Sequence, residues 1–559
     1  MVIRILSRIL LVSLFANLAT QTSAQGLFTP SAAKAGPIDG DTSVGVVRSR
    51  SAQINFNYLN DQMSSGSKAT DGSSNLTLNL FDDKSAAIQV WETNVAGSEV
   101  EKVLSGWSPG SENSLATIVI NEGEISGKFW MENRLYRFRP QPGQGYVISE
   151  IDTSAFEVDD DTPEDIGGSA KLTSTKRAAK NEAIDLLVLF TIKASTQVSK
   201  VKNTATLWVA EMNEVLRRSG SATDNMFNLV GVKVVDVEVN KPNTDVYRLA
   251  GKDDGYLDGV HKLRDQLGAD LVSLVYWPIK QNLCGKANGI GPKPGSDTGT
   301  PNVAFNVVFL GCAGDYLSFA HEIGHTVGAR HDHWVDNDKN YNHGLSWPQA
   351  GWRTVMAYND RCDNFGVKCS RLPFFSNPNV QHNGKKTGRK TDHKFPAYNA
   401  KLFRENRSLI AAYRSKSAVS TFMTCPVPAG AGPAAGKYAG KPYWKVAIPG
   451  LFYGGTRTST PRECHDACAK DANCTSWTWI NFNSSCSFMS YCPSKANPPG
   501  FEHFSGYSGR KSICTEATPR CNLKYDGTAG SPPHPAGTQP NRLPSTPTPA
   551  QGSGWQSIN

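Results

Sequence analysis

The sequence predicts a multidomain chain: a β-rich N-terminal region, an α/β domain and a small disulfide-rich unit. Three observations support this. Alternating strand-like runs fill residues 25–177, buried strands alternate with helices from about residue 183, and all 12 cysteines lie between Cys284 and Cys521. At ~150 residues per domain, 559 residues correspond to three or four folding units. With 39% hydrophobic and 19% charged residues, the composition excludes a membrane transporter, a coiled coil and a wholly disordered chain.

Residues 1–24 have the features of a cleaved signal peptide. Arg4 and Arg8 precede an apolar run at 9–18, and small residues at 22–24 form a cleavage site. The run is short for a membrane span, and no later stretch is long and apolar enough to cross a bilayer. We therefore expect a secreted protein without a membrane span. An uncut N-terminal anchor is the alternative.

Residues 25–177 are predicted to form a separate β-rich region. Strands are expected where apolar and polar residues alternate, at residues 54–58, 76–80, 116–120 and 128–131. An acidic stretch at 157–165 and a dibasic, polar linker at 174–177 follow. Such a linker is easily cut by proteases.

Residues 178–418 are predicted to form the α/β domain. Apolar runs and helical spacing indicate a strand at 184–190, a helix at 204–218, a strand at 230–239, a helix at 256–266, and strands at 270–277 and 303–310. Alternating strands and helices are typical of a layered α/β fold.

One string of residues, HEIGHTVGARHD at 321–332, predicts a metal site. His321 and His325 are four residues apart, so one face of a helix presents both imidazoles. Gly328 allows the chain to leave the helix, and His331 can then return as a third ligand. Three protein ligands leave a position open for water, as in catalytic zinc sites, and Glu322 is placed to take a proton from that water. A chance match to this extended pattern is expected in on the order of one in 10⁴ to 10⁵ chains.

The string resembles that of the metzincin zinc proteases, and Asp332 after the third histidine is similar to the reprolysin branch. Metzincins also carry a methionine turn. Met356, 25 residues after His331, fits this turn and by resemblance lies beneath the metal. Tyr358 stands where astacin-like and serralysin-like enzymes have a tyrosine that touches zinc or stabilises the oxyanion. Typical reprolysins lack it.

The segment GWRTVMAY at 351–358, with Cys362, Cys369 and residues 370–379, looks like the bacterial peptidyl-Asp metalloendopeptidases. The resemblance covers roughly residues 183–415. It implies a mixed sheet with a zinc helix, one catalytic zinc ion and an endopeptidase (a hydrolase of EC 3.4.24 type) that cuts beside acidic residues. No residue could be assigned to hold an acidic side chain, and no calcium site could be assigned.

Two disulfides are expected around the site. Cys284 and Cys312 flank the strand that precedes the zinc helix, and Cys362 with Cys369 would close a short loop after the methionine turn. Free thiols or a second metal site are the alternatives, and export argues against both.

Position and size make residues 25–177 a candidate propeptide that inhibits its own enzyme. No cysteine precedes Cys284, so a cysteine switch is excluded. Two routes remain open: an aspartate from the acidic stretch could cap the metal, or the domain could obstruct the cleft. The region could also be a binding domain that stays attached.

The C-terminal part comprises a Pro/Ala/Gly linker at 419–436, a cysteine-rich unit at 437–521 and a Pro-rich tail at 522–559 that we expect to be disordered. The spacing C-x3-C-x5-C-x11-C resembles a PAN/apple domain. That resemblance implies the pairs Cys464–Cys486 and Cys468–Cys474, although eight cysteines allow 105 pairings. Such modules bind proteins or carbohydrates, and a structural cap is the alternative.

Two functions are consistent with these features. One is a secreted zinc endopeptidase, and the other is an extracellular binding protein or adhesin that uses the protease domain as a scaffold. The intact Glu322 favours the peptidase, because a scaffold has no need of a base. A nucleic-acid role is the weakest, because no basic run has interleaved aromatics. The net charge of +8 also divides unevenly: residues 25–177 carry −8 and residues 178–559 carry +14. This favours association of the two parts and an acidic substrate.

Overall fold

The computed structural model describes residues 26–30, 43–156 (without 65, 99 and 142–144), 177–415 (without 278–282), residue 467 and five short strands between 443 and 510. The chain divides into two compact units, Met1–Phe422 and Met423–Asn559. Within the described residues, no helix has both the length and the apolar character that crossing a membrane requires.

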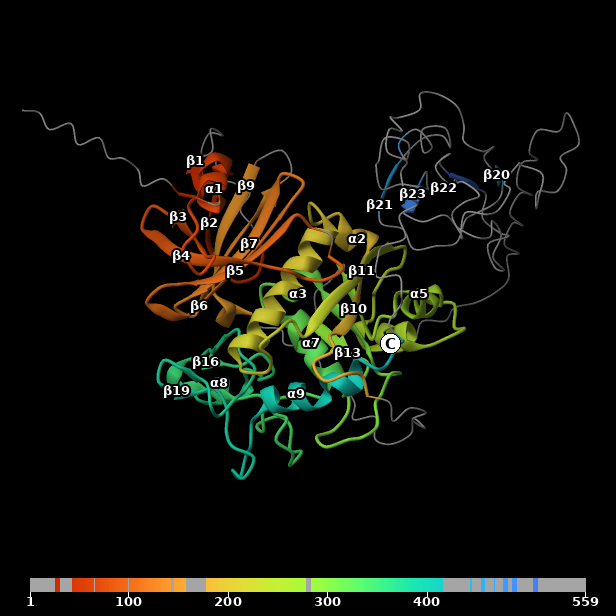
Figure 1. Cartoon of the computed structure of the whole chain (residues 1–559). Coiled ribbons are helices and arrows are strands. Elements are labelled where there is room, and N and C mark those ends of the chain that lie inside the picture. Colours follow the sequence, from red (N-terminus) through yellow and green to blue (C-terminus); the bar gives the residue numbers. More distant parts are fainter. Residues whose placement is uncertain are drawn as a thin grey trace, which may run out of the picture. The chain divides into compact units, whose positions relative to one another are not determined.

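The N-terminal domain is a nine-stranded antiparallel sheet in the order β1-β2-β9-β8-β7-β6-β5-β4-β3 (Figure 1). Its strands are β1 (Phe28–Pro30), β2 (Val46–Ile54), β3 (Ser74–Phe81), β4 (Lys84–Thr93), β5 (Lys102–Ser108), β6 (Ser111–Asn121), β7 (Glu124–Met131), β8 (Arg134–Gln141) and β9 (Gly145–Ile151). The sheet curls into a near-barrel, because Asn79 of β3 hydrogen-bonds both the N–H (2.9 Å) and the carbonyl (2.5 Å) of Phe28 in β1. Phe129 and Phe138 are fully buried in its core.

Three of the four strands expected in this region are present, within β3, β6 and β7. The expected strand at 54–58 is wrong, because β2 ends at Ile54 and helix α1 (Phe56–Met63) follows. The side-chain oxygen of Asn55 accepts a hydrogen bond from the N–H of Tyr58 at 3.1 Å and so caps this helix. A short 3₁₀ helix, η1 (Thr153–Ala155), follows β9.

The second domain, residues 177–415, is built on a five-stranded mixed sheet in the order β11-β10-β12-β14-β13. The strands β10 (Ile184–Thr191), β11 (Phe227–Val235), β12 (Leu271–Tyr276) and β14 (Phe305–Phe309) run parallel, and β13 (Gly285–Ala287) is an antiparallel edge strand. Every residue of β10, β12 and β14 is buried, as expected for strands covered on both faces.

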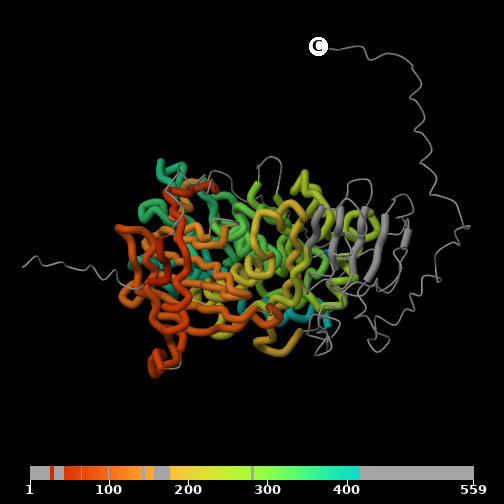
Figure 2. The backbone as a smooth tube through the Cα atoms, turned by 90° about the horizontal axis from the view of Figure 1, so that it is seen from above, coloured from red at the N-terminus to blue at the C-terminus, as the bar shows by residue number. Residues whose placement is uncertain are grey.

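The helices of this domain agree with the sequence only in part. The expected helices at 204–218 and 256–266 are α3 (Val201–Arg218) and α5 (Gly259–Leu267), whereas no helix was assigned to α4 (Pro242–Ala250) or α9 (Asn399–Ile410). The remaining helices are α2 (Ile192–Ser195), α6 (Leu310–Ala313), α7 (Ser318–Val327), α8 (Asp360–Asn364) and the 3₁₀ helix η2 (Pro348–Ala350). Figures 1 and 2 show the N-terminal domain beside this domain, with α3 between the N-terminal sheet and α7.

Short strands complete the region after α7: β15 (Ser346–Trp347), β16 (Trp352–Arg353) and β17 (Ser370–Arg371) form one sheet, and β18 (Gln381–His382) pairs with β19 (Lys385–Lys386).

The second unit contains an antiparallel sheet in the order β20-β24-β22-β23-β21, made of Tyr443–Trp444, Gly506–Arg510, Ser476–Ile480, Ser485–Met489 and Gly454–Arg457. The pairings Cys464–Cys486 and Cys468–Cys474 lie outside the described residues, as do the signal peptide, the 157–176 linker and the tail. The PAN/apple assignment stays a prediction.

Candidate metal centre

Helix α7 places two histidines side by side and then ends at a glycine. All ten residues of α7 are buried, including His321 and His325. Gly328 follows with φ 109°, a conformation that side chains disfavour. A Cβ on Gly328 would also lie 2.2 Å from the carbonyl oxygen of Pro292. The turn therefore requires glycine, as the sequence predicted.

The chain returns after this turn and brings His331 to the helix. The Nε2 atoms of the three histidines converge: His325 lies 2.9 Å from both His321 and His331, which are 3.1 Å apart. The Nδ1 atoms point away, that of His321 to the carbonyl of Val355 (2.9 Å) and that of His325 to the carbonyl of Ala329 (2.8 Å). These carbonyls hold the proton on Nδ1 and leave the Nε2 lone pairs facing one another.

The three histidines fit a zinc ion. Each Nε2 of this small triangle can lie at the usual zinc–nitrogen distance of about 2.0–2.1 Å from one central ion. Burial lowers the pKa of all three imidazoles, that of His325 to about 3, so they are neutral as metal ligands must be. Three facing lone pairs without a cation would repel one another. Within the described part of the chain, the three ligand atoms form a group within 4.8 Å.

Glu322 lies on the same helix, directly after His321 in sequence, and is fully buried. A Cβ on Gly285 would lie 2.5 Å from Oε1 of Glu322. The carboxylate therefore packs against the backbone of β13, an edge strand of the sheet whose three residues are buried.

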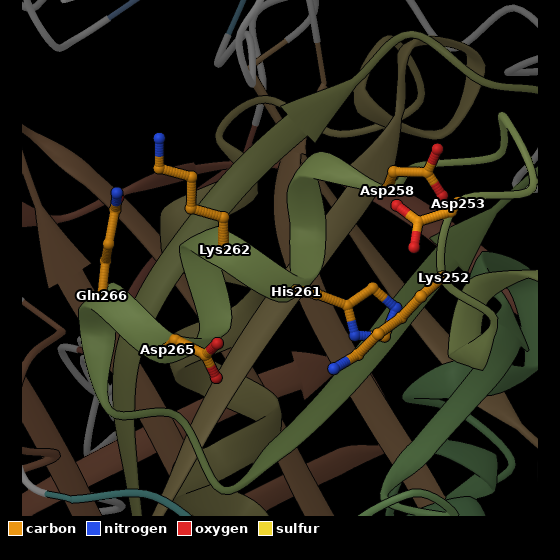
Figure 3. Close-up of a pocket in the computed structure, with 7 residues that line it drawn as sticks. All are labelled: Lys252, Asp253, Asp258, His261, Lys262, Asp265 and Gln266. Carbon is orange, nitrogen blue, oxygen red and sulfur yellow. The ribbon is translucent and has the colours of Figure 1, made fainter.

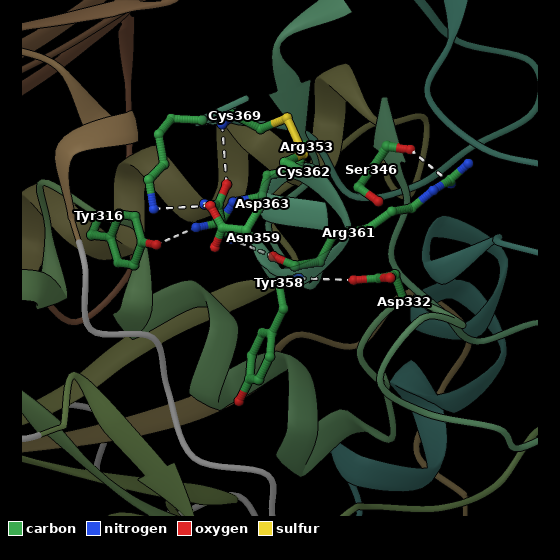
Figure 4. Close-up of a disulfide and its surroundings, with 12 residues drawn as sticks. Tyr316, Asp332, Ser346, Arg353, Tyr358, Asn359, Arg361, Cys362, Asp363 and Cys369 are labelled. Atoms are coloured by element: carbon green, nitrogen blue, oxygen red, sulfur yellow. Dashed lines mark hydrogen bonds and ion pairs between the residues drawn. A yellow bond between two sulfur atoms is a disulfide. The ribbon is translucent and has the colours of Figure 1, made fainter. Parts of the chain in front are cut away.

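The methionine turn lies against the zinc helix. Met356 is fully buried, and a Cβ on Gly324 would lie 2.6 Å from its Sδ atom. Gly324 thus allows Met356 to approach the helix between the two ligands. The ring of Tyr358 lies 3.9 Å from the ring of His331, centroid to centroid. Figure 4 shows this ring directed away from the Cys362–Cys369 disulfide.

Asp332 joins the third ligand to the methionine turn, a contact that sequence reasoning missed. Its carboxylate accepts hydrogen bonds from the N–H of Tyr358 (2.9 Å, Figure 4) and of Trp334 (3.0 Å). Burial raises the pKa of Asp332. The sequence pattern includes Asp332, but it does not predict the hydrogen bond to the N–H of Tyr358, which lies 26 positions away.

The structure contains both disulfides expected around the site, Cys284–Cys312 and Cys362–Cys369. The first disulfide links Cys284, the residue before β13, to Cys312 in α6, the helix that precedes the zinc helix α7. The second closes the loop after the methionine turn, where the N–H of Cys369 also donates to Asn359 (Figure 4).

A depression elsewhere on the surface is separate from this centre. It is lined by α5 and the preceding loop, that is by Lys252, Asp253, Asp258, His261, Lys262, Asp265 and Gln266 (Figure 3). Asp258 accepts hydrogen bonds from the N–H groups of Asp254 and Gly255. Its carboxylate thus stabilises the local loop, and we assign the depression no chemistry.

A mixed α/β sheet, a helix with two histidines, a glycine turn and a third histidine define a zinc metallopeptidase. The model of Metallo-peptidase family M12 matches residues 180–365. A peptidyl-Asp metalloendopeptidase of Stenotrophomonas maltophilia is 32% identical over 57% of this chain and 75% of its own length. One of Xanthomonas campestris is 29% identical over 58% of this chain and 76% of its own.

The chain therefore belongs to the M12 metallopeptidases, hydrolases of peptide bonds, and is related to the bacterial peptidyl-Asp metalloendopeptidases. Metalloproteinase-II from Bacteroides fragilis superposes over 48% of this chain and 83% of its own, with a TM-score of 0.31 at 10% identity. That likeness is too weak to carry an argument.

Proposed function

We propose that the protein is a secreted zinc endopeptidase in which Glu322 is the general base. The observation that carries the proposal is the position of Glu322. Glu322 directly follows the first histidine on α7, and its carboxylate packs against the backbone of the edge strand β13.

Each residue of the centre then has a role. His321, His325 and His331 would hold a zinc ion through Nε2. Such an ion would polarise the substrate carbonyl and lower the pKa of a bound water to about 7. Glu322 takes the proton of the attacking water and delivers it to the leaving amine. Tyr358, whose ring packs against that of His331, would donate a hydrogen bond to the developing oxyanion. Met356 supports the histidines from below.

The edge strand β13 is suited to align the substrate. An extended peptide can add to a free sheet edge through main-chain hydrogen bonds. The contact between Gly285 and Glu322 would place the scissile bond of such a peptide beside the base.

The base is tested by substitution. Glu322→Ala should keep stoichiometric zinc and lose proteolysis of casein, because the ligands remain and the proton acceptor is removed. His325→Ala is the contrasting variant and should lose both zinc and activity. Proteolysis retained by purified Glu322→Ala protein would contradict the assignment.

We further propose a preference for sites beside acidic residues. Two relatives are named peptidyl-Asp metalloendopeptidases. In this chain, residues 178–559 carry a net charge of +14. A positively charged enzyme favours an anionic substrate. Cleavage of a peptide library would test this, and a profile without enrichment of Asp or Glu would contradict it.

The enzyme is proposed to be made as a latent precursor, with a signal peptide at 1–24 and a propeptide at 25–177. Its support is the position and size of residues 25–177 and the dibasic linker that follows them. N-terminal sequencing of the exported protein should give a start near residue 178 for the mature chain. A sole start near residue 25 would contradict processing.

A further inference from the structure

The contact between the N-terminal domain and α3 is centred on a buried carboxylate. Glu211, in the middle of α3, accepts hydrogen bonds on both oxygens from strand β7: Nζ of Lys128 at 2.6 Å and Nε1 of Trp130 at 2.7 Å. The side chains of Lys128 and Glu211 are only 2% and 3% exposed. Lys128 also donates to the carbonyl of Gly314 at 2.7 Å.

Another residue on this face of α3 also contacts the N-terminal domain. Asn203 and Leu207 precede Glu211 at helical spacing and lie on the same face. Asn121 of β6 donates a hydrogen bond to Asn203 at 2.8 Å, with both residues buried. A helix face that lacked this domain would expose these groups to water.

A second contact lies on the segment that leads into the zinc helix. Arg137 of β8 forms an ion pair with Asp315, whose side chain is 6% exposed. The ring of Phe156 stacks on that of Tyr316, with centroids 4.4 Å apart and planes at 7°. The N-terminal domain therefore packs against the residues just before α7.

Tyr316 connects this contact to the metal centre. Arg353 donates hydrogen bonds to the hydroxyl of Tyr316 and to the carbonyl of Ala357 in the methionine turn (Figure 4 shows Tyr316 and Arg353). The guanidinium of Arg371 lies 4.0 Å from the ring centroid of Tyr316. The same turn holds His321 through the carbonyl of Val355. Phe156 therefore packs on Tyr316, which is linked to the methionine turn of the metal site through Arg353.

The N-terminal domain also meets the sheet at its far edge. The N–H of Leu229 in β11 donates to the carbonyl of Ala96 at 2.9 Å. Strand β11 is at one edge of the sheet, and β13, beside Glu322, is at the opposite edge.

We propose that the N-terminal domain, residues 26–156, is a lasting subunit of the enzyme: it stays bound after the linker is cut and supports the metal centre through Tyr316. Maturation is then cleavage without dissociation. The proposal does not depend on Glu322 as the base, because it concerns assembly and zinc affinity.

The first test cuts the full chain at a defined place. A site for a specific protease is introduced within residues 157–176 of the Glu322→Ala chain, which limits self-digestion. After cutting, the two fragments should co-elute in size-exclusion chromatography at about 0.15 M salt and keep stoichiometric zinc. Fragments that separate under these conditions overturn the proposal.

A second test weakens the buried ion pair. In the cut protein, Lys128→Met should raise the dissociation constant of the fragments on the order of 100-fold, because it leaves Glu211 without its cation. Lys102→Met is the matched control: Lys102 pairs with Glu92 on the exposed face of the same sheet and should change nothing. The double variant Lys128→Met/Glu211→Met should bind more tightly than Lys128→Met alone. Equal binding by Lys128→Met and Lys102→Met overturns the proposal.

A third test measures metal support. Phe156→Ala should lower zinc affinity about tenfold in competition with a chelator, as for other residues that orient ligands indirectly, and Phe156→Tyr should restore it. Phe81→Ala, which removes a ring stacked on Arg48 within the N-terminal domain, is the control. Unchanged zinc affinity in Phe156→Ala overturns this part of the proposal.

Discussion

The orientation of each ligand is set by a backbone carbonyl as much as by the histidine itself. The carbonyls of Val355 and Ala329 fix the rings of His321 and His325. One is near in sequence and the other is 34 residues away. The spacing of His321 and His325 predicted their shared face, because helical geometry is local. The carbonyl of Val355 could not be predicted, because it depends on how the methionine turn folds back.

Tyr358 provides a prediction at the scale of one atom. Tyr358→Phe keeps the ring against His331 and removes only the hydroxyl. If that hydroxyl stabilises the oxyanion, kcat should fall about 10²-fold, with little change in KM. Steady-state kinetics on a peptide substrate, with zinc content measured in parallel, would check this. A wild-type kcat in Tyr358→Phe would leave the oxyanion to the zinc alone.

At the scale of elements, the centre depends on three segments meeting: the zinc helix α7, the irregular segment after Gly328 that carries His331 and Asp332, and the methionine turn. Asp332 links the last two through the N–H of Tyr358. The helix α9 also contributes, because the amide of Asn406 donates to the carbonyls of Pro292 and Val327 at 2.8 Å. These links join residues up to 114 positions apart, so local patterns did not reveal them.

The glycine turn can be tested against a matched turn. Gly328→Ala combines a positive φ with a Cβ placed 2.2 Å from Pro292 O, and should destabilise the protein and reduce zinc content. Gly351 also has a positive φ, of 68° against 109° at Gly328, but nothing lies within 4 Å of the Cβ that Gly351→Ala adds. Gly351→Ala should lower the free energy of unfolding only by the backbone strain, about 1–2 kcal/mol. Thermal unfolding would measure both, and equal losses would mean that the close approach at Gly328 does not matter.

At the scale of the whole molecule, the net charges favour docking, whereas two ion pairs between the domains have the opposite polarity. Residues 25–177 carry −8 and residues 178–559 carry +14, so long-range attraction favours the observed docking. The specific contacts, however, include cations of the N-terminal domain on acids of the catalytic domain: Lys128 on Glu211 and Arg137 on Asp315. The net charges thus predict association but not the pairs that make it.

The stability of the docked domains should fall in mild acid. His382 hydrogen-bonds Asn133 of the N-terminal domain at 3.0 Å, and burial, with a further effect from Arg218, lowers its pKa to about 4. Between pH 6.5 and 4 the unfolded chain binds a proton that the folded chain does not. Stability is therefore complete above pH 6.5 and is lost as the pH falls toward 4, at most by about 1.4 kcal/mol per pH unit.

The contribution of His382 to this pH dependence can be measured by comparing a variant with the wild type. His382→Gln keeps a polar group near Asn133 and cannot titrate. The fall in Tm between pH 7 and pH 5 should be smaller in this variant than in the wild type, although other buried histidines still respond to acid. An identical fall would show that His382 does not titrate in this range.

The sequence by itself determined what local geometry can encode: the β-rich and α/β regions, the strands β10, β12 and β14, the two histidines of one helix face and the glycine that ends the helix. It failed at residues 54–58, where the cap by Asn55 turned an alternating pattern into a helix. The tertiary structure alone decided the nine-stranded near-barrel, the carbonyls that orient the ligands, the link from Asp332 to Tyr358 and the ion pair of Lys128 with Glu211. Each of these joins distant residues, and such partners become neighbours only when the hydrophobic cores have packed.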